Sequence, residues 1–362
     1  MQLSNQDKQR YARHLVIPQF GEQGQMKLKQ SRILVIGAGG LGSPILLYLA
    51  AAGVGTIGIV EFDSIDRSNL QRQVLYKESE VGLPKIEQAK QRILEVNSSI
   101  QIHTYPFQIT AANALSIISQ YDVVVDGTDN FPTRYLVNDA CVLTGKPLVY
   151  GSIHQFEGQV AVFNHLSGNG LRSSNYRDLF PTPPPPEMVP NCAEGGVLGV
   201  LPGIIGSMQA NEALKIVTGI GQPLIDRIFI FDAANFITRT LKIRKNDTYQ
   251  ITQLIDYDEF CGIATVNAPQ EIDVLELKQW QEDGKIFQLI DVRERHEYEL
   301  DNIEGLLCPL SELKLHLSGI RRDIPVVVHC QTGKRSLQAI NQLSDFDNLI
   351  NLRGGLKAWR LL

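Results

Sequence analysis

The feature that most constrains the fold of this chain is a glycine-rich turn between a short apolar run and a helical segment. Residues 32–37 read RILVIG, and so short a run of branched apolar residues is typical of a buried parallel strand. GAGGLG (37–42) follows, and SPILLYLAAA (43–52) predicts a helix. Glycines permit a tight turn and let backbone N–H groups approach an anion at the positive end of a helix. We therefore expect a nucleotide phosphate at Gly37, Gly39, Gly40 and Gly42.

Strand and helix patterns alternate along the rest of the chain. Runs such as IGIVE (57–61), QIHTY (101–105) and VVVD (123–126) predict further strands, with a helix over 85–96 between them. This alternation indicates an α/β chain with a Rossmann-like doubly wound sheet. A shorter alternation begins after a polar stretch. The expected organisation is a nucleotide-binding domain, a linker and a smaller α/β domain, at residues 1–245, 246–268 and 269–362.

Length, charge and cysteine content exclude several classes of protein. A chain of 362 residues is too long for one ordinary domain, and its net charge of −5 argues against a general nucleic-acid binder. No apolar run approaches the ~18 residues of a membrane-spanning helix, and the polar N-terminus lacks a signal-peptide core. Five widely spaced cysteines make no disulfide framework. We expect a cytoplasmic protein that does not enter membranes.

Charged residues after the glycine turn indicate which nucleotide binds. Glu61 ends the next strand at the spacing of an acid that reaches a ribose hydroxyl. Arg72 and Lys85 supply compact positive charge, which suits a triphosphate better than a bridging pyrophosphate. Asp126 and Asp129 follow a strand at the edge where open α/β sheets bind ligands, and a carboxylate there suits Mg²⁺ held jointly with phosphates. Singly, Arg72 and Lys85 also fit a solvated surface, and Asp129 fits an Asx turn.

Seven motifs spread over residues 1–245 together resemble the MoeB and ThiF adenylyltransferases, which are relatives of the ubiquitin-activating enzymes. They are RYARHL (10–15), GAGGLG (37–42), EFD (61–63), SNLQRQ (68–73), GLPK (82–85), DGTDN (126–130) and the TR of NFPTR (130–134). The resemblance implies that the chain uses ATP and Mg²⁺ to adenylate the C-terminal carboxylate of a small ubiquitin-like sulfur carrier ending in Gly-Gly.

The resemblance also assigns roles to individual residues. Asp129 is expected to hold Mg²⁺, and Arg13 matches an arginine that reaches the nucleotide of the partner subunit, which implies a homodimer. Catalysis would consist mainly of positioning and charge neutralisation by Arg13, Arg72, Lys85 and Mg²⁺. Besides the glycine turn, the expected nucleotide-binding residues are Glu61, Asp63, Ser68, Asn69, Leu70, Gln71, Arg72, Lys85, Asp129 and Asn130.

Relatives usually carry two C-x-x-C pairs that bind a structural zinc. In the corresponding stretches this chain reads NYRDLFP (175–181) and IRKNDTYQIT (243–252), without cysteine. We therefore expect no zinc, and other contacts to hold this corner together.

The remaining cysteines receive different interpretations. Cys192 follows the proline-rich segment 181–191 and matches a family cysteine near the adenylate, where a thiol forms a transient thioester or disulfide. A small buried side chain is the alternative interpretation of Cys192. Cys141 and Cys308 are expected in the core, and no role is predicted for Cys261.

Cys330 begins a loop of a different kind. The sequence CQTGKRS (330–336) follows the apolar strand PVVVH and precedes a helix. Backbone N–H groups at that helix N-terminus, together with Lys334 and Arg335, favour a reactive thiolate. A thiolate of this kind accepts sulfur as a persulfide.

Residues 269–362 resemble a rhodanese domain through DVRE (291–294), the Cys330 loop and LRGGLKAW (352–359). The resemblance implies that Cys330 carries sulfur from a cysteine desulfurase or from thiosulfate, while Asp291 and Arg293 support the loop. Phosphatases of this fold have a loop one residue longer, so the four residues between Cys330 and Arg335 favour sulfur transfer.

Two other functions remain open at this point. A nicotinamide-dependent oxidoreductase with an accessory domain would bind NAD(P) and would have no use for a persulfide. A non-catalytic scaffold for a ubiquitin-like partner would need a broken nucleotide site, whereas every expected position is filled. The carrier itself is left open among routes to molybdopterin, thiamine, cysteine and thiolated tRNA, with molybdopterin or a related sulfur-containing cofactor as the leading choice.

Overall fold

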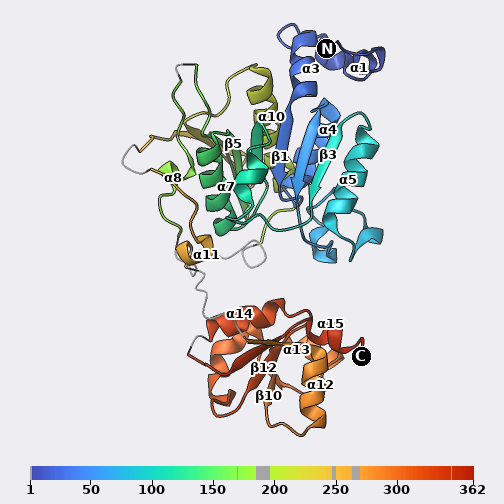
Figure 1. The fold of residues 1–362 in the computed structure, drawn as a ribbon, viewed down its shortest axis with the longest axis vertical. Coiled ribbons are helices and arrows are strands. Elements are labelled where there is room, and N and C mark those ends of the chain that lie inside the picture. Colours follow the sequence, from blue (N-terminus) through green and yellow to red (C-terminus); the bar gives the residue numbers. More distant parts are fainter. Residues whose placement is uncertain (1, 169, 185–195, 247–249, 263–269, 344) are drawn as a thin grey trace. The chain divides into compact units, whose positions relative to one another are not determined.

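The computed structural model describes residues 2–168, 170–184, 196–246, 250–262, 270–343 and 345–362 (Figure 1). The chain forms two compact units, Met1–Ile263 and Ala264–Leu362, each with a sheet and cores of its own. None of the helices within the described ranges is long and apolar enough to span a lipid bilayer.

The first unit is built on an eight-stranded sheet of order β3-β2-β1-β4-β5-β6-β7-β8. The first five strands of this order are parallel, and the last three run antiparallel to their neighbours. The predicted Rossmann-like doubly wound sheet is confirmed, with an antiparallel extension that the sequence did not indicate. The strands are β1 (Arg32–Ile36), β2 (Thr56–Val60), β3 (Gln101–Tyr105), β4 (Val123–Asp126), β5 (Leu148–His154), β6 (Glu157–Phe163), β7 (Arg227–Asp232) and β8 (Ile237–Lys242).

Helices cover both faces of this sheet because its central strands are apolar on both sides. In β1, Ile33 and Val35 belong to one core, while Leu34 and Ile36 belong to the other. The first core is closed by α3 (Gly21–Gln30), α4 (Gly42–Ala52), α5 (Lys85–Val96) and α10 (Leu201–Thr218). The second is closed by α6 (Ala114–Ile118), α7 (Phe131–Thr144), α8 (Tyr176–Leu179) and α11 (Tyr257–Phe260).

The strand order places a crevice at the carboxyl ends of β1 and β4. These neighbouring strands lead to helices on opposite faces of the sheet, since β1 continues into α4 and β4 into α7. The two connections therefore diverge, which is the point where open α/β sheets bind their ligands.

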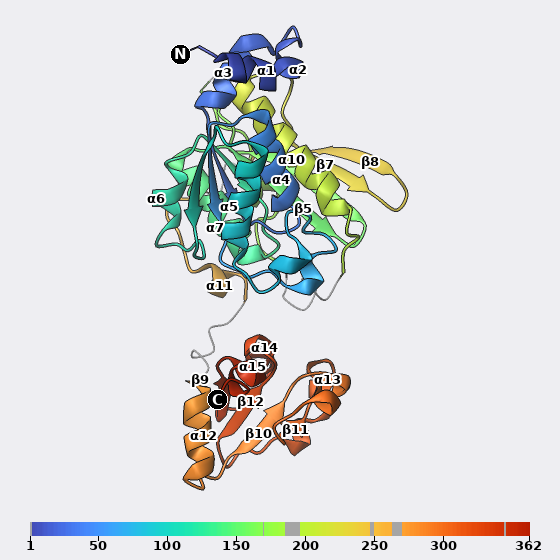
Figure 2. The ribbon, with the colours of Figure 1, turned by 90° about the vertical axis from the view of Figure 1, so that its right-hand side faces the viewer.

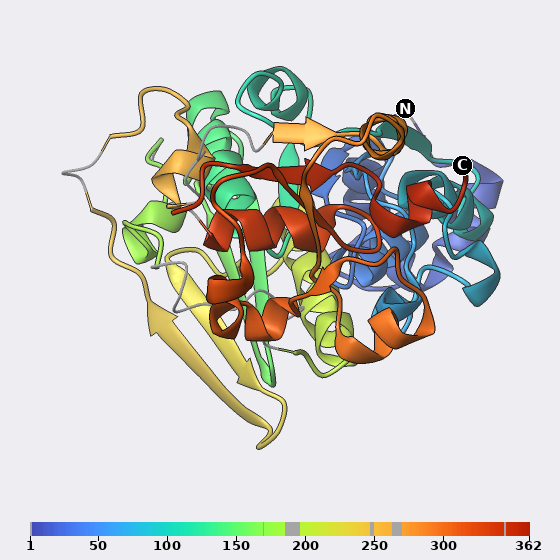
Figure 3. The same cartoon turned by 90° about the horizontal axis from the view of Figure 1, so that it is seen from below.

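Two short helices and a hairpin complete the first unit. Helices α1 (Asn5–Arg10) and α2 (Ala12–Leu15) lie with α3 at the end of the unit away from α11 (Figure 1). The β7–β8 hairpin, drawn in yellow, extends beyond the helices of its unit in Figure 2 and again in Figure 3. Every residue of β8 is exposed.

The second unit is a five-stranded parallel sheet of order β11-β10-β12-β13-β9. One face packs against α14 and the other against α12 and α15. The elements are β9 (Gln270–Ile272), α12 (Val274–Glu282), β10 (Gln288–Asp291), α13 (Arg295–Leu300), β11 (Leu306–Leu307), β12 (Val326–His329), α14 (Lys334–Gln342), β13 (Leu349–Leu352) and α15 (Gly355–Trp359).

A buried ion pair joins three separate segments of the first unit. Asp139 of α7 accepts hydrogen bonds from Nε and Nη2 of Arg177 in α8, at 2.8 and 2.7 Å. The hydroxyl of Tyr257 in α11 donates to the same carboxylate at 2.8 Å, and the Arg177 guanidinium lies 4.4 Å from the Phe260 ring centroid. Asp139 and Arg177 are almost completely buried. Helix α11, which follows the sheet in the sequence, is thus held to the rest of the first unit by polar as well as apolar contacts.

We predict that Asp139→Ala lowers the free energy of unfolding of the first unit by about 3–5 kcal/mol, because it removes the carboxylate that accepts two hydrogen bonds from the buried guanidinium of Arg177. Urea unfolding followed by far-UV circular dichroism measures this loss. The chain's two tryptophans, Trp280 and Trp359, both lie in the second unit, so their fluorescence transition is an internal control that should not move. A dichroism transition shifted by less than about 1 kcal/mol would show that the pair contributes little.

Candidate functional site

The crevice at the strand ends is an open cleft of about 890 Å³, a volume that includes solvent at its mouth. The cleft gathers nine of the predicted binding residues, which are Gly37, Gly39, Gly40, Glu61, Asp63, Arg72, Lys85, Asp129 and Asn130.

The glycine turn has the geometry that an anion site needs. Gly37 has a φ of +89°, which an L side chain rarely adopts. A Cβ on Gly42 would lie 2.1 Å from the Gly37 carbonyl oxygen, so the turn closes tightly on itself at the start of α4. Gly39 and Gly40 line the cleft. The turn therefore presents backbone N–H groups at a helix N-terminus without intervening side chains.

Glu61 shapes the cleft by joining two strand ends. Its Oε2 accepts from the N–H of Ala38 at 2.9 Å, and its Oε1 accepts from the N–H groups of Phe62 and Asp63, each at 2.8 Å. An ionised carboxylate has about four acceptor positions, so about one remains at Oε2. Glu61 can still accept from a ribose hydroxyl, but its main structural role is to hold the glycine turn against the end of β2.

The two predicted cations both lie at the cleft. Lys85 begins α5, is buried, and has its Nζ 3.6 Å from Oδ2 of Asp63. Arg72 donates from Nη1 to the carbonyl of Ser68 at 3.2 Å. A buried ammonium beside a half-exposed carboxylate has lost much of its hydration, which increases its attraction for phosphate oxygens.

The loop after β4 carries the carboxylates. Asp126 is buried and accepts from the N–H and hydroxyl of Thr128 at 2.9 and 2.7 Å, and burial raises the pKa of this carboxyl. Asp129 is exposed at the cleft. Asn130 caps α7 by accepting from the N–H of Thr133 at 2.9 Å. Asp129 is thus the carboxylate of this loop that is exposed at the cleft.

Some predicted residues lie outside the cleft wall, and some wall residues were missed. Ser68 and Asn69 belong to a short 3₁₀ turn capped by Asp66, and Gly42, Leu70 and Gln71 likewise do not line the cleft. Several wall residues lie within the motifs given above but were not assigned to the site, namely Leu41, Phe62, Gln73, Gly127, Thr128 and Thr133. Other wall residues, such as Gln108, Ile109 and Ile153, lie outside those motifs, and no sequence signal identifies them.

Arg13 lies far from the cleft of its own chain. The hydroxyl of nearby Tyr11 accepts from Asn97 Nδ2, which also donates to the carbonyl of Ala50 near the last turn of α4. The glycine turn is at the first turn of this helix, which is about 16 Å long. The exposed Arg13 therefore lies near the end of α4 that is away from the glycine turn and the cleft.

In the described part of the two stretches that correspond to the family's zinc-binding corner, hydrogen bonds join Asn175, Asp178 and Asn246. Asn175 and Asp178 are hydrogen-bonded to each other, with Asp178 Oδ2 accepting from Asn175 N at 2.6 Å and from Asn175 Nδ2 at 2.9 Å. Asp178 Oδ1 also accepts from the N–H of Asn246 at 2.8 Å, which links the two stretches that zinc would join. Among the described residues, no group of three or more His, Cys, Asp or Glu side chains could hold a metal ion.

Cys192 lies outside the described residues. Cys141 and Cys308 are fully buried in cores, as predicted. Cys261 is buried as well, and burial raises the pKa of the Cys261 and Cys308 thiols to about 11. The Cys141 pKa is raised by burial too, so all three thiols stay protonated at neutral pH.

Cys330 lies at the start of the loop that leads into α14. Its Sγ accepts from the N–H of Gly333 at 3.2 Å, and the Ser336 hydroxyl lies 3.6 Å away. Gly333 has a φ of +92°, and a Cβ on Gly355 would lie 2.3 Å from the Cys330 carbonyl. The loop is thus closely packed, and it directs an N–H group at the sulfur.

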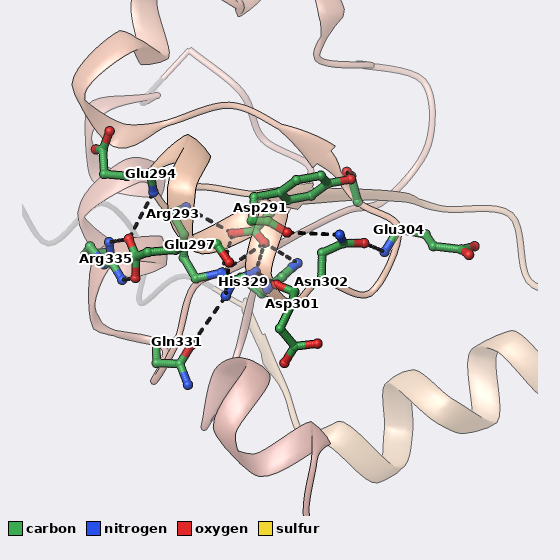
Figure 4. Close-up of polar contacts among 12 residues, drawn as sticks. Asp291, Arg293, Glu294, Glu297, Asp301, Asn302, Glu304, His329, Gln331 and Arg335 are labelled. Carbon is green, nitrogen blue, oxygen red and sulfur yellow. Dashed lines mark hydrogen bonds and ion pairs between the residues drawn. The ribbon is translucent and has the colours of Figure 1, made fainter.

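A network of hydrogen bonds and ion pairs supports this loop (Figure 4). Arg293 forms a buried pair with Asp291 and donates to the Asp301 carbonyl at 2.6 Å, while its Nη1 lies 3.5 Å from Oε1 of Gln331 in the loop. His329 is fully buried nearby, and burial lowers its pKa. The predicted supporting role of Asp291 and Arg293 agrees with these contacts.

The ThiF family model matches residues 11–251, and the model of the rhodanese-like domain matches residues 273–362. The probable adenylyltransferase/sulfurtransferase MoeZ of Mycobacterium tuberculosis is 47% identical over 99% of this chain and 94% of its own length. The sulfur carrier protein adenylyltransferase of Thermus thermophilus is 49% identical over 73% of this chain and 100% of its own. The adenylyltransferase and sulfurtransferase MOCS3 of Culex quinquefasciatus is 40% identical over 99% and 88%.

Among solved structures, E. coli MccB with selenomethionine MccA has a TM-score of 0.59 over 68% of this chain and 74% of that chain. At 20% sequence identity, this likeness shows that the fold is shared.

Proposed function

The chain belongs to the ThiF family and ends in a rhodanese-like domain, and from this premise we propose that it adenylates a small sulfur-carrier protein and then supplies it with sulfur. The observation that carries the proposal is one cleft that combines the glycine turn, Arg72, Lys85 and Asp129, in the same chain as the Cys330 loop.

The first step activates the carrier. A C-terminal carboxylate of the carrier attacks the α-phosphorus of ATP, the bond to the β-phosphate breaks, and pyrophosphate leaves. The substrate supplies the nucleophile, so the enzyme contributes positioning and charge neutralisation. The glycine turn binds phosphate oxygens through its N–H groups, and Arg72 and Lys85 balance the charge that develops on pyrophosphate.

The exposed carboxylate of Asp129 fits magnesium, which prefers oxygen ligands and is usually bound by one or two carboxylates together with substrate phosphates. Mg²⁺ held there with the phosphates would add to the neutralisation of phosphate charge.

The second step transfers sulfur. The terminal sulfur of a Cys330 persulfide attacks the carrier's acyl carbon, AMP leaves, and an acyl disulfide forms. A thiolate, for which we propose Cys192, then attacks the sulfur of Cys330. This attack releases the carrier thiocarboxylate and leaves a disulfide between the two cysteines, which an external thiol must reduce before the next cycle. A cysteine desulfurase is the proposed source of the sulfur, and a route to molybdopterin or a related cofactor is the proposed setting, in the cytoplasm.

Separate variants test the two steps. Asp129→Asn should lower carrier-dependent ATP–pyrophosphate exchange by about 10²–10³-fold, because a charge needed near the phosphates is lost.

Cys330→Ala should keep that exchange near the wild-type rate. It should abolish the conversion of a carrier ending in Gly-Gly to its thiocarboxylate, which is measured as a mass gain equal to the difference between sulfur and oxygen. Normal exchange in the first variant, or a normal yield of thiocarboxylate in the second, would remove the assigned role.

We propose further that the enzyme acts as a homodimer in which Arg13 serves the cleft of the partner. Arg13→Ala and Asp129→Asn should each be inactive alone. An equal mixture that exchanges subunits should recover about a quarter of the wild-type exchange activity, since half of the dimers then contain one intact cleft. No recovery in a mixture shown by tagged subunits to contain mixed dimers would mean that Arg13 does not act across subunits.

A further inference from the structure

The segment after Cys330 carries two cations, Lys334 and Arg335, and Arg335 is paired with a carboxylate from another helix. Arg335 ends the loop that begins at Cys330, and Glu297 lies in α13. Nη1 and Nη2 of Arg335 donate to the two carboxylate oxygens of Glu297, at 2.6 and 2.7 Å. The side chains of Arg335 and Glu297 are 34% and 27% exposed, so water screens this pair only in part. Figure 4 shows Glu297 against Arg335.

This pairing changes the charge that an incoming sulfur donor meets. A guanidinium has five N–H donors, and a two-bond pair with a carboxylate uses two of them and balances the charge. The hydrogen bonds from Arg335 hold the pKa of Glu297 at about 2, so the carboxylate is ionised throughout the physiological range. Arg335 therefore presents much less net positive charge to an incoming sulfur donor than its place in the sequence indicates.

The two kinds of donor considered for Cys330 differ in how much they need that charge. With thiosulfate, the Cys330 thiolate attacks the outer sulfur, the S–S bond breaks, and sulfite leaves with the bonding electron pair. With a persulfide, the thiolate attacks the terminal sulfur, and the donor's own thiolate leaves. Thiosulfate and sulfite are dianions, so the first reaction depends strongly on positive charge at the loop, whereas a donor held by its own protein surface does not.

We propose that Glu297 is a specificity-determining residue that weakens the use of small dianionic sulfur donors at Cys330 and thereby favours a protein-bound persulfide. The inference rests on the proposed sulfur transfer, and it extends that proposal to the class of donor. The Glu297 carboxylate accepts from Arg335 and from the N–H of Glu294 and does not contact the sulfur, so it acts on the reaction through the charge of the loop.

The test uses the full chain with Glu297→Gln, which keeps an oxygen acceptor for Arg335 and removes the negative charge. The rate at which Cys330 becomes a persulfide is measured by mass spectrometry with thiosulfate and, separately, with cysteine persulfide. The KM for thiosulfate should fall about tenfold, as expected when one partly buried counter-charge is removed, with a smaller change in kcat. The rate with cysteine persulfide should change by a smaller factor than the thiosulfate KM, because cysteine persulfide carries less net negative charge than thiosulfate at neutral pH.

Two further variants separate the proposed effect on charge from a structural effect of Glu297. Glu299→Gln lies in the same helix at an exposed position and changes the net charge by the same amount as Glu297→Gln. It should leave the thiosulfate KM at the wild-type value. Adding Arg335→Met to Glu297→Gln should remove the gain, because the released charge is then absent.

Three outcomes would overturn the inference. An unchanged or higher thiosulfate KM in Glu297→Gln would show that Glu297 does not repel dianions. An equal loss with both donors would show that Glu297 only supports the loop. If the wild-type chain forms no Cys330 persulfide from either donor, the proposed sulfur transfer itself fails, and the inference fails with it.

Discussion

The carboxylate of Glu61 holds together the two strand ends from which the nucleotide cleft is built. Three backbone N–H groups, one from the glycine turn and two from the residues after β2, converge on it. A turn of glycines has many accessible conformations in isolation, and this buried acceptor selects one of them. The positions of the phosphate-binding N–H groups, and of Asp63 beside Lys85, follow from that choice.

The two candidate sites solve the same physical problem in similar ways. In the proposed mechanism each stabilises an anion, phosphate in one unit and sulfur in the other, at a helix N-terminus that follows a buried parallel strand. Each has a left-handed glycine, Gly37 in the first and Gly333 in the second. They differ in how closely the cation is paired, because Lys85 lies 3.6 Å from Asp63 whereas Arg335 donates two short hydrogen bonds to Glu297.

The sequence predicted those parts of the structure that depend on local patterns. Strand, turn and helix around GAGGLG could be recognised because apolar periodicity and glycine spacing act within a few residues, and the matches to SNLQRQ and DGTDN identified Arg72 and Asp129. Contacts between distant segments could not be predicted in this way. The antiparallel strand β8 is exposed along its length and lacks an apolar signal, while Tyr257 and Cys261 looked like linker residues although they pack in the second core. The pairing of Arg335 with Glu297 joins residues 38 positions apart, and only packing of α13 against the loop reveals it.

We propose that the cleft of the first unit binds a triphosphate and not a dinucleotide. The most direct test is titration calorimetry of the full chain with ATP and Mg²⁺, and separately with NAD. We expect saturable one-site binding of ATP that an excess of NAD does not displace. Tight binding of NAD by a chain that does not bind ATP would contradict this proposal.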